Sequence, residues 1–110
     1  MTRRVKLMAD YDCWPLWGMD GDDIGNLDPA GLGLSSGLVA RLVHWSEAYD
    51  ARLDRTDPAR SPQTSPEDSS RFEREGLELW RLVREELGSG YEVHYFSDLE
   101  QRLMSPDKSG

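Results

Sequence analysis

The stretch VKLMADYDCWPLW, residues 5–17, decides the fold and marks the place to look for function. Apolar side chains take every second position in its first half: Val5, Leu7, Ala9 and Tyr11. A period of two is typical of a strand that buries one face, so we predict a strand over residues 4–11. Because Pro15 has no backbone N–H to donate, we expect the pairing of this strand to end at or before Trp14.

Trp14 and Trp17 follow this strand and are expected in the turn beyond it. Each indole can bury roughly 150–250 Å² of surface, a large area for a single small domain. Each ring therefore either lines the core or anchors an interface with another molecule. Both alternatives stay open at the level of sequence.

The length and composition indicate one polar globular domain, which we expect to span residues 1–97. Charged residues make up 31% of the 110 residues and the formal net charge is −8, which argues against binding to nucleic acid or to an anionic membrane. The single cysteine, the lack of a signal-like segment and the lack of an apolar run of ~20 residues favour the cytoplasm. No motif typical of a cofactor site occurs, so we expect no cofactor.

Two amphipathic helices are predicted in the middle of the chain. The first covers residues 36–54, and its apolar side chains recur at helical spacing: Leu38, Leu42, Trp45, Tyr49 and Leu53. Ser35 or Ser36 can cap this helix by accepting hydrogen bonds from its first backbone N–H groups.

The second helix is predicted over residues 66–87. Pro66 suits the first helical turn, and Gly88 suits a left-handed cap at the end. Gly76 interrupts the apolar stripe of this helix at a cost of ~1 kcal/mol relative to alanine. We therefore expect the first helix to approach the second closely at Gly76.

Residues 91–96 alternate again and predict a second strand. Ser97 and Glu100 fit a capping box, so a short helix is expected over residues 98–104, followed by a disordered tail at 105–110. The predicted fold class is α+β in the order β-α-α-β, with a small antiparallel sheet and a two-helix hairpin packed on one face. Because two strands make a marginal sheet, either the segment 12–34 adds a strand or two chains join sheet edges as a homodimer.

Several of these motifs together resemble a family of small bacterial proteins without an established activity. The motifs are KLMADYDCWPLW, the GNLDP of residues 25–29, and Trp45, Tyr49 and Asp50 in the helix that Leu34-Ser35 opens. The likeness covers most of residues 5–96. Arginine outnumbers lysine eleven to two, which is typical of GC-rich genes and favours an actinobacterial source. The resemblance implies a single domain and assigns no site residue.

The segment 10–33 is the sharpest chemical feature. It carries six aspartates and no Lys, Arg or His: Asp10, Asp12, Asp20, Asp22, Asp23 and Asp28. Crowded like charges repel one another, and a cationic partner would relieve that repulsion. With the nearby aromatic rings, the segment predicts a partner-binding patch for a protein with a basic surface: Tyr11, Asp12, Trp14, Trp17, Asp20, Asp22 and Asp23.

A metal site is the alternative interpretation of the same segment. Residues 20–25, DGDDIG, partly match a calcium-binding loop, but Ile24 and Gly31 take positions that require oxygen ligands. Aspartates that form turns explain the pattern without a metal.

Cys13 is a weak candidate for a nucleophile. Neither His44 nor His94 is placed beside it by the predicted elements, and a free cysteine is most often a packing residue. Three Cys and His residues without ligand spacing do not predict a zinc site.

The sequence therefore favours a non-catalytic protein-interaction or regulatory domain, of which an immunity-like role is one form. The alternative is a small enzyme or divalent-metal-dependent binder that uses the Asp-rich loop 10–28.

Overall fold

The computed structural model describes residues 3–10, 13–20, 24–51 and 66–106. It contains a five-stranded mixed sheet in the order β3-β2-β1-β4-β5 and two long helices. The strands are β1 (Arg3–Leu7), β2 (Leu16–Gly18), β3 (Gly25–Leu27), β4 (Tyr91–Ser97) and β5 (Arg102–Met104). The helices are α1 (Ser36–Asp50) and α2 (Pro66–Leu87), with short 3-10 turns η2 (Pro29–Leu32) and η4 (Gly88–Gly90). The predicted α+β class is confirmed.

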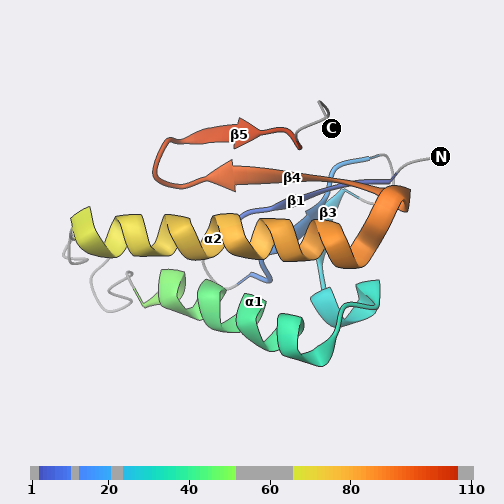
Figure 1. Ribbon diagram of the computed structural model, residues 1–110, viewed down its shortest axis with the longest axis horizontal. Helices are drawn as coiled ribbons and strands as arrows, with labels where there is room; N and C mark the ends of the chain where they lie inside the picture. Colours follow the sequence, from blue (N-terminus) through green and yellow to red (C-terminus); the bar gives the residue numbers. More distant parts are fainter. Residues whose placement is uncertain (1–2, 11–12, 21–23, 52–65, 107–110) are drawn as a thin grey trace.

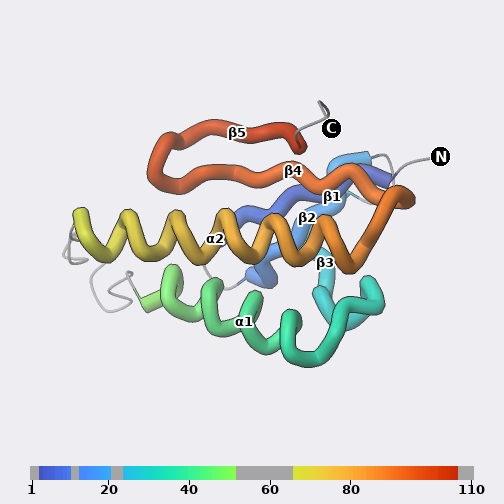
Figure 2. Tube along the Cα trace, in the orientation of Figure 1, coloured from blue at the N-terminus to red at the C-terminus, as the bar shows by residue number. Residues whose placement is uncertain are grey.

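The two helices pack as a hairpin on one face of the sheet, as predicted. In Figures 1 and 2, α2 passes in front of β1 and lies next to β4, and α1 runs alongside α2 in the opposite direction. The Ser35 side chain caps α1 by accepting from the backbone N–H of Leu38 at 3.3 Å. Helix α2 has the predicted bounds, and Gly88 takes a left-handed φ of 71° after it. The predicted end of the first helix at residue 54 lies outside the described residues.

The predicted antiparallel pairing of the first and last long strands is wrong. β1 and β4 pair in parallel, from Arg3 opposite Tyr91 to Leu7 opposite Tyr95. The prediction assumed that every connection reverses the chain. The turn η2 instead leads from β3 into α1 without reversing direction, so β4 returns parallel to β1 (Figure 1).

The segment after β1 contributes two strands of its own. The first strand ends before Trp14, as predicted, but β1 stops at Leu7 and is shorter than the predicted strand at 4–11. The predicted turn position of Trp17 is wrong, because β2 begins directly after Pro15, contains Trp17 and pairs antiparallel with β1. The Pro15 carbonyl accepts a hydrogen bond from Met8 N at 2.8 Å. Proline can take this part in the pairing because it lacks only the backbone N–H and keeps its carbonyl acceptor. β3 then pairs antiparallel with β2 and forms one edge of the sheet.

The predicted short helix at 98–104 is also wrong. Residues 98–101 form a turn with Gln101 at a positive φ of 54°, and β5 follows as the other edge strand, antiparallel to β4. Ser97 still caps locally, because its hydroxyl accepts from Glu100 N at 3.0 Å. That single capping bond does not outweigh the pairing of β5 with β4.

The strand alternation of the sequence separates the two faces of the sheet. Val5 and Leu7 of β1 point to the inner face, which the helices cover, and both are fully buried. Leu16, Val93 and Tyr95 join the same core. We call the opposite side the open face, because no helix of the described residues covers it (Figure 1). None of the described helices is long and apolar enough to cross a lipid bilayer.

One buried polar cluster ties α2 to β4. Glu73 of α2 is only 6% exposed, and its two carboxyl oxygens accept from the hydroxyls of Tyr95 at 2.7 Å and Ser97 at 2.6 Å. Burial, followed by the contact with Glu73, raises the pKa of Tyr95 far above its ordinary range. The two hydroxyls satisfy both oxygens of a buried carboxyl group, which would otherwise be costly.

Candidate protein-interaction surface

Trp14 is the most exposed of the tryptophans and stands on a fixed piece of backbone. Its side chain is 46% exposed. Its backbone N–H donates to Asn26 Oδ1 at 2.9 Å, and its carbonyl accepts from Asn26 Nδ2 at 2.6 Å. For Trp14, the structure therefore favours the exposed alternative over core lining.

Trp17 lies in the middle of β2, on the open face. Its neighbours Leu16 and Gly18 are buried, so alternation turns the Trp17 ring away from the helices. The indole N–H donates to the carbonyl of Met8 at 2.9 Å, and the ring is half-buried. Trp17 is thus fastened to β1 and offers only part of its ring to a partner.

Asp20 follows β2 and is already paired. Its carboxylate accepts from the backbone N–H of Arg4 at 2.9 Å and from Arg4 Nε at 2.7 Å. The hydrogen bond from the Arg4 side chain, with that from its backbone, lowers the pKa of the Asp20 carboxyl. Because this carboxylate is neutralised within the chain, it attracts a basic partner less than the sequence alone indicates.

The remaining four residues of the predicted patch are not placed by the structure. Tyr11, Asp12, Asp22 and Asp23 lie outside the described residues. Asp28, a further aspartate of the acidic segment, has a structural role: its side chain accepts from Ala30 N at 3.0 Å and caps η2. Of the predicted patch, the structure therefore describes Trp14 just before β2, Trp17 within β2 and Asp20 just after it.

Two contacts that the sequence reasoning missed lie on or beside the open face. The Asn26 side chain holds the Trp14 backbone through two hydrogen bonds. In the sequence, an Asn next to Gly25 indicates only a turn. His94 is 7% exposed, with its Nε2 2.7 Å from Glu92 Oε2 and its Nδ1 buried without a hydrogen-bond partner. The i, i+2 spacing of Glu92 and His94 on a strand was the signal that could have paired them.

The described residues do not form the arrangement that a metal site or a Cys13 nucleophile would need. Within these ranges, no group of three or more His, Cys, Asp or Glu side chains gathers as metal ligands. Cys13 is half-buried, His44 is exposed on α1, and His94 is held by Glu92. The predicted calcium-type loop includes Asp22 and Asp23, which lie outside the described residues.

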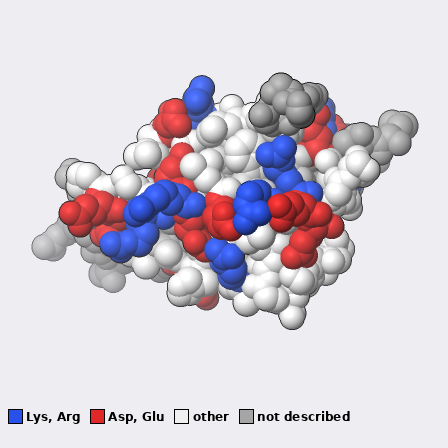
Figure 3. Space-filling view, viewed as in Figure 1, with Lys and Arg blue, Asp and Glu red and all other residues white. Residues whose placement is uncertain are grey.

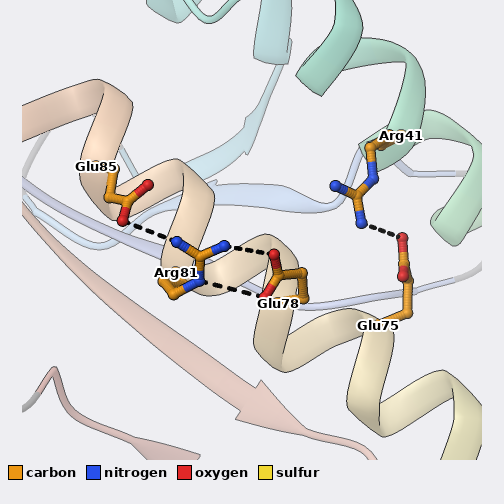
Figure 4. A network of polar contacts seen from close by, with 5 residues as sticks. All are labelled: Arg41, Glu75, Glu78, Arg81 and Glu85. Carbon is orange, nitrogen blue, oxygen red and sulfur yellow. Dashed lines mark hydrogen bonds and ion pairs between the residues drawn. The ribbon is translucent and has the colours of Figure 1, made fainter.

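The helical side of the molecule has a different character. Figure 3 shows a belt of alternating acidic and basic side chains along α2. In Figure 4, Arg81 lies between Glu78 and Glu85, while Arg41 reaches across from α1 to Glu75. These charges satisfy one another at the surface, so a partner that covered this belt would have to desolvate paired ions.

Together these features define a small bilayered α+β domain that carries a braced, exposed indole at one edge of its sheet. The chain matches, over residues 3–98, the family model described as Serratia CdiI immunity protein-like. The match covers most of the chain, and the protein belongs to this family. A search of curated proteins finds no match.

Proposed function

We propose that this protein acts as an immunity protein, which binds a protein toxin and blocks its action. The observation that carries the proposal is the match to the CdiI immunity protein-like family over residues 3–98. An immunity protein acts by binding, and the sequence had favoured a non-catalytic interaction domain for independent reasons of charge and aromatic content.

The contact surface that we propose is the patch around β2, with Trp14 at its centre. Exposed tryptophans on a rigid backbone are frequent hot spots of protein interfaces, because they bury much area and lose little conformational entropy. The net charge of −8 favours a basic toxin and speeds its encounter with the protein. Asp20 contributes less to this attraction than the sequence predicts, since Arg4 neutralises it.

Toxicity and binding, measured side by side, test the proposal. The polypeptide encoded beside this gene is expressed in a sensitive bacterium with and without the protein, and the purified pair is studied by calorimetry. We expect the protein to restore growth and to bind the toxin with a Kd below about 1 µM.

Trp14→Ala should weaken binding at least tenfold and reduce protection. Leu99→Ala is the matched control, because Leu99 is comparably exposed but lies in the β4–β5 turn. The proposal fails if the wild-type protein neither binds nor protects. Equal loss in both variants would refute only the location of the surface.

A further inference from the structure

Trp14 lies outside the backbone ladder of the sheet, yet both of its backbone polar groups are satisfied. A single side chain does this, because Asn26 Oδ1 accepts from Trp14 N and Asn26 Nδ2 donates to Trp14 O. The Asn26 amide thus replaces the peptide unit that a neighbouring strand would have offered. Asn26 Nδ2 also lies 3.2 Å from the carbonyl oxygen of Leu16, so it bridges the residues on either side of Pro15.

The brace itself is held firmly. Asn26 is the middle residue of β3, opposite Trp17, with the flanking pairs Gly25–Gly18 and Leu27–Leu16 in register. The backbone that carries the amide is therefore fixed by the sheet, and the amide in turn fixes Trp14. This arrangement leaves the exposed indole little freedom except rotation about its own side-chain bonds.

We infer that Asn26 is a positioning residue that presents the Trp14 indole, already ordered, to an apolar pocket on a basic toxin. The inference rests on the proposed function and adds the residue that prepares the site. Ordering an anchor before contact lowers the entropy cost of binding, and this advantage appears mainly as slower dissociation.

The chemistry of position 26 separates this role from mere packing. Asn26→Asp keeps the shape and the acceptor for Trp14 N, but it sets a carboxylate oxygen against the carbonyls of Trp14 and Leu16. Asn26→Ala removes the acceptor and both donated bonds. Ile24→Ala is the control, since Ile24 is exposed at the other end of the β2–β3 hairpin and takes no part in the brace.

The first measurement needs no partner. Amide hydrogen exchange by NMR should show a protected Trp14 N–H in the wild type and loss of that protection, by tenfold or more, in Asn26→Ala. In protein labelled with 5-fluorotryptophan, the Trp14 fluorine signal should change in both Asn26 variants, while those of Trp45 and Trp80 stay in place. Unchanged Trp14 exchange in Asn26→Ala would overturn the inference.

The second measurement is a double-mutant cycle with an inactivated form of the toxin that the protection assay identifies. We expect Asn26→Ala to weaken binding about tenfold, chiefly through a faster dissociation rate, and to have no further effect in a Trp14→Ala background. Ile24→Ala should leave both rates unchanged. Additive losses in the cycle would overturn the inference while leaving the proposed function intact.

If Trp14→Ala alone binds as tightly as the wild type, Trp14 is not the anchor and the inference is likewise overturned. Absence of any binding by the wild-type chain would count against the proposed function. The exchange experiment would still decide whether Asn26 orders Trp14.

Discussion

Gly76 of α2 lies against the edge of the Trp45 ring of α1, so that a Cβ built on the glycine would stand 2.8 Å from Trp45 Cζ2. The same Cβ would meet the Tyr95 hydroxyl even more closely. Trp45 cannot retreat, because it stacks on Phe72 at 4.5 Å between ring centroids and donates to the carbonyl of Phe72. The two helices and β4 therefore meet at a point where only glycine fits.

Gly76→Ala should destabilise the protein by ~1–3 kcal/mol although alanine is the better helix former, because the extra methyl group forces Trp45 or Tyr95 to shift. Gly37→Ala is the matched control: it lies in α1, has open space around its Cβ position and should be neutral or slightly stabilising. Urea denaturation of both variants measures the difference. A Gly76→Ala variant as stable as Gly37→Ala would contradict the packing.

Tyr95→Phe should cost ~1–3 kcal/mol, because it leaves one oxygen of the buried Glu73 carboxyl group without its donor. Tyr91→Phe makes the same chemical change on the same strand. The Tyr91 hydroxyl receives a single long contact from Arg3 at 3.5 Å, so we expect a loss below ~0.5 kcal/mol. Thermal denaturation of the pair would show a clearly lower midpoint for Tyr95→Phe alone if the cluster stabilises the fold.

Glu86→Gln should make the free energy of unfolding less dependent on pH in the acidic range. The backbone N–H and the hydroxyl of Ser35 donate to Glu86 at 2.7 Å each, and these bonds lower the pKa of the Glu86 carboxyl. A lowered folded-state pKa stabilises the protein above the unfolded value of about 4.5 and loses this effect as the pH falls through the lowered value. The free energy of unfolding should therefore fall more steeply below pH 4.5 in the wild type than in Glu86→Gln.

Glu47→Gln serves as the control for this titration, since Glu47 is exposed on α1. Identical pH profiles for the wild type and Glu86→Gln would show that the contact between α2 and the start of α1 does not stabilise the fold.

Trp14→Ala should change the stability by less than ~1 kcal/mol, because the ring is exposed and its backbone is held by Asn26. Trp80→Ala should cost ~3–5 kcal/mol, since Trp80 is buried, stacks on Tyr95 and donates to the carbonyl of Val93 at 2.8 Å. Chemical denaturation compares the two truncations directly. A large loss for Trp14→Ala would mean that this indole is a core residue after all.

The helices were the most predictable part of the fold, because their signals are local. Ser35, Pro66 and Gly88 mark helix ends through their own side chains or backbone freedom, and the structure places all three as predicted. The close approach of the helices at Gly76 was predictable, because a glycine inside a helix lowers its stability relative to alanine and is therefore expected where a larger side chain would not fit.

The sheet was less predictable, because its short strands are stabilised by non-local pairing. β2, β3 and β5 are three residues each, too short for a periodic pattern to stand out. The parallel direction of β4 relative to β1 depends on the path that the chain takes through η2. No single residue between the two strands predicts that path.

The candidate site shows the same division between local and non-local information. Trp14 was singled out from the sequence, but the hydrogen bonds that hold its backbone come from Asn26 on the neighbouring strand β3. Arg4 and Asp20 meet through the β1–β2 hairpin, so the neutralisation of Asp20 could not be inferred without that pairing.

The pairing of β1 with β4 also sets when the protein can become useful after its messenger is translated. Arg3 and Tyr91 are 88 positions apart, and the centre of the sheet cannot close until the ribosome has added β4. At ~5–20 residues per second, β1 waits on the order of 4–18 s for its neighbour. On the proposed function, protection would therefore depend on copies that have folded before a toxin arrives, since a chain whose synthesis has just begun still lacks the centre of its sheet.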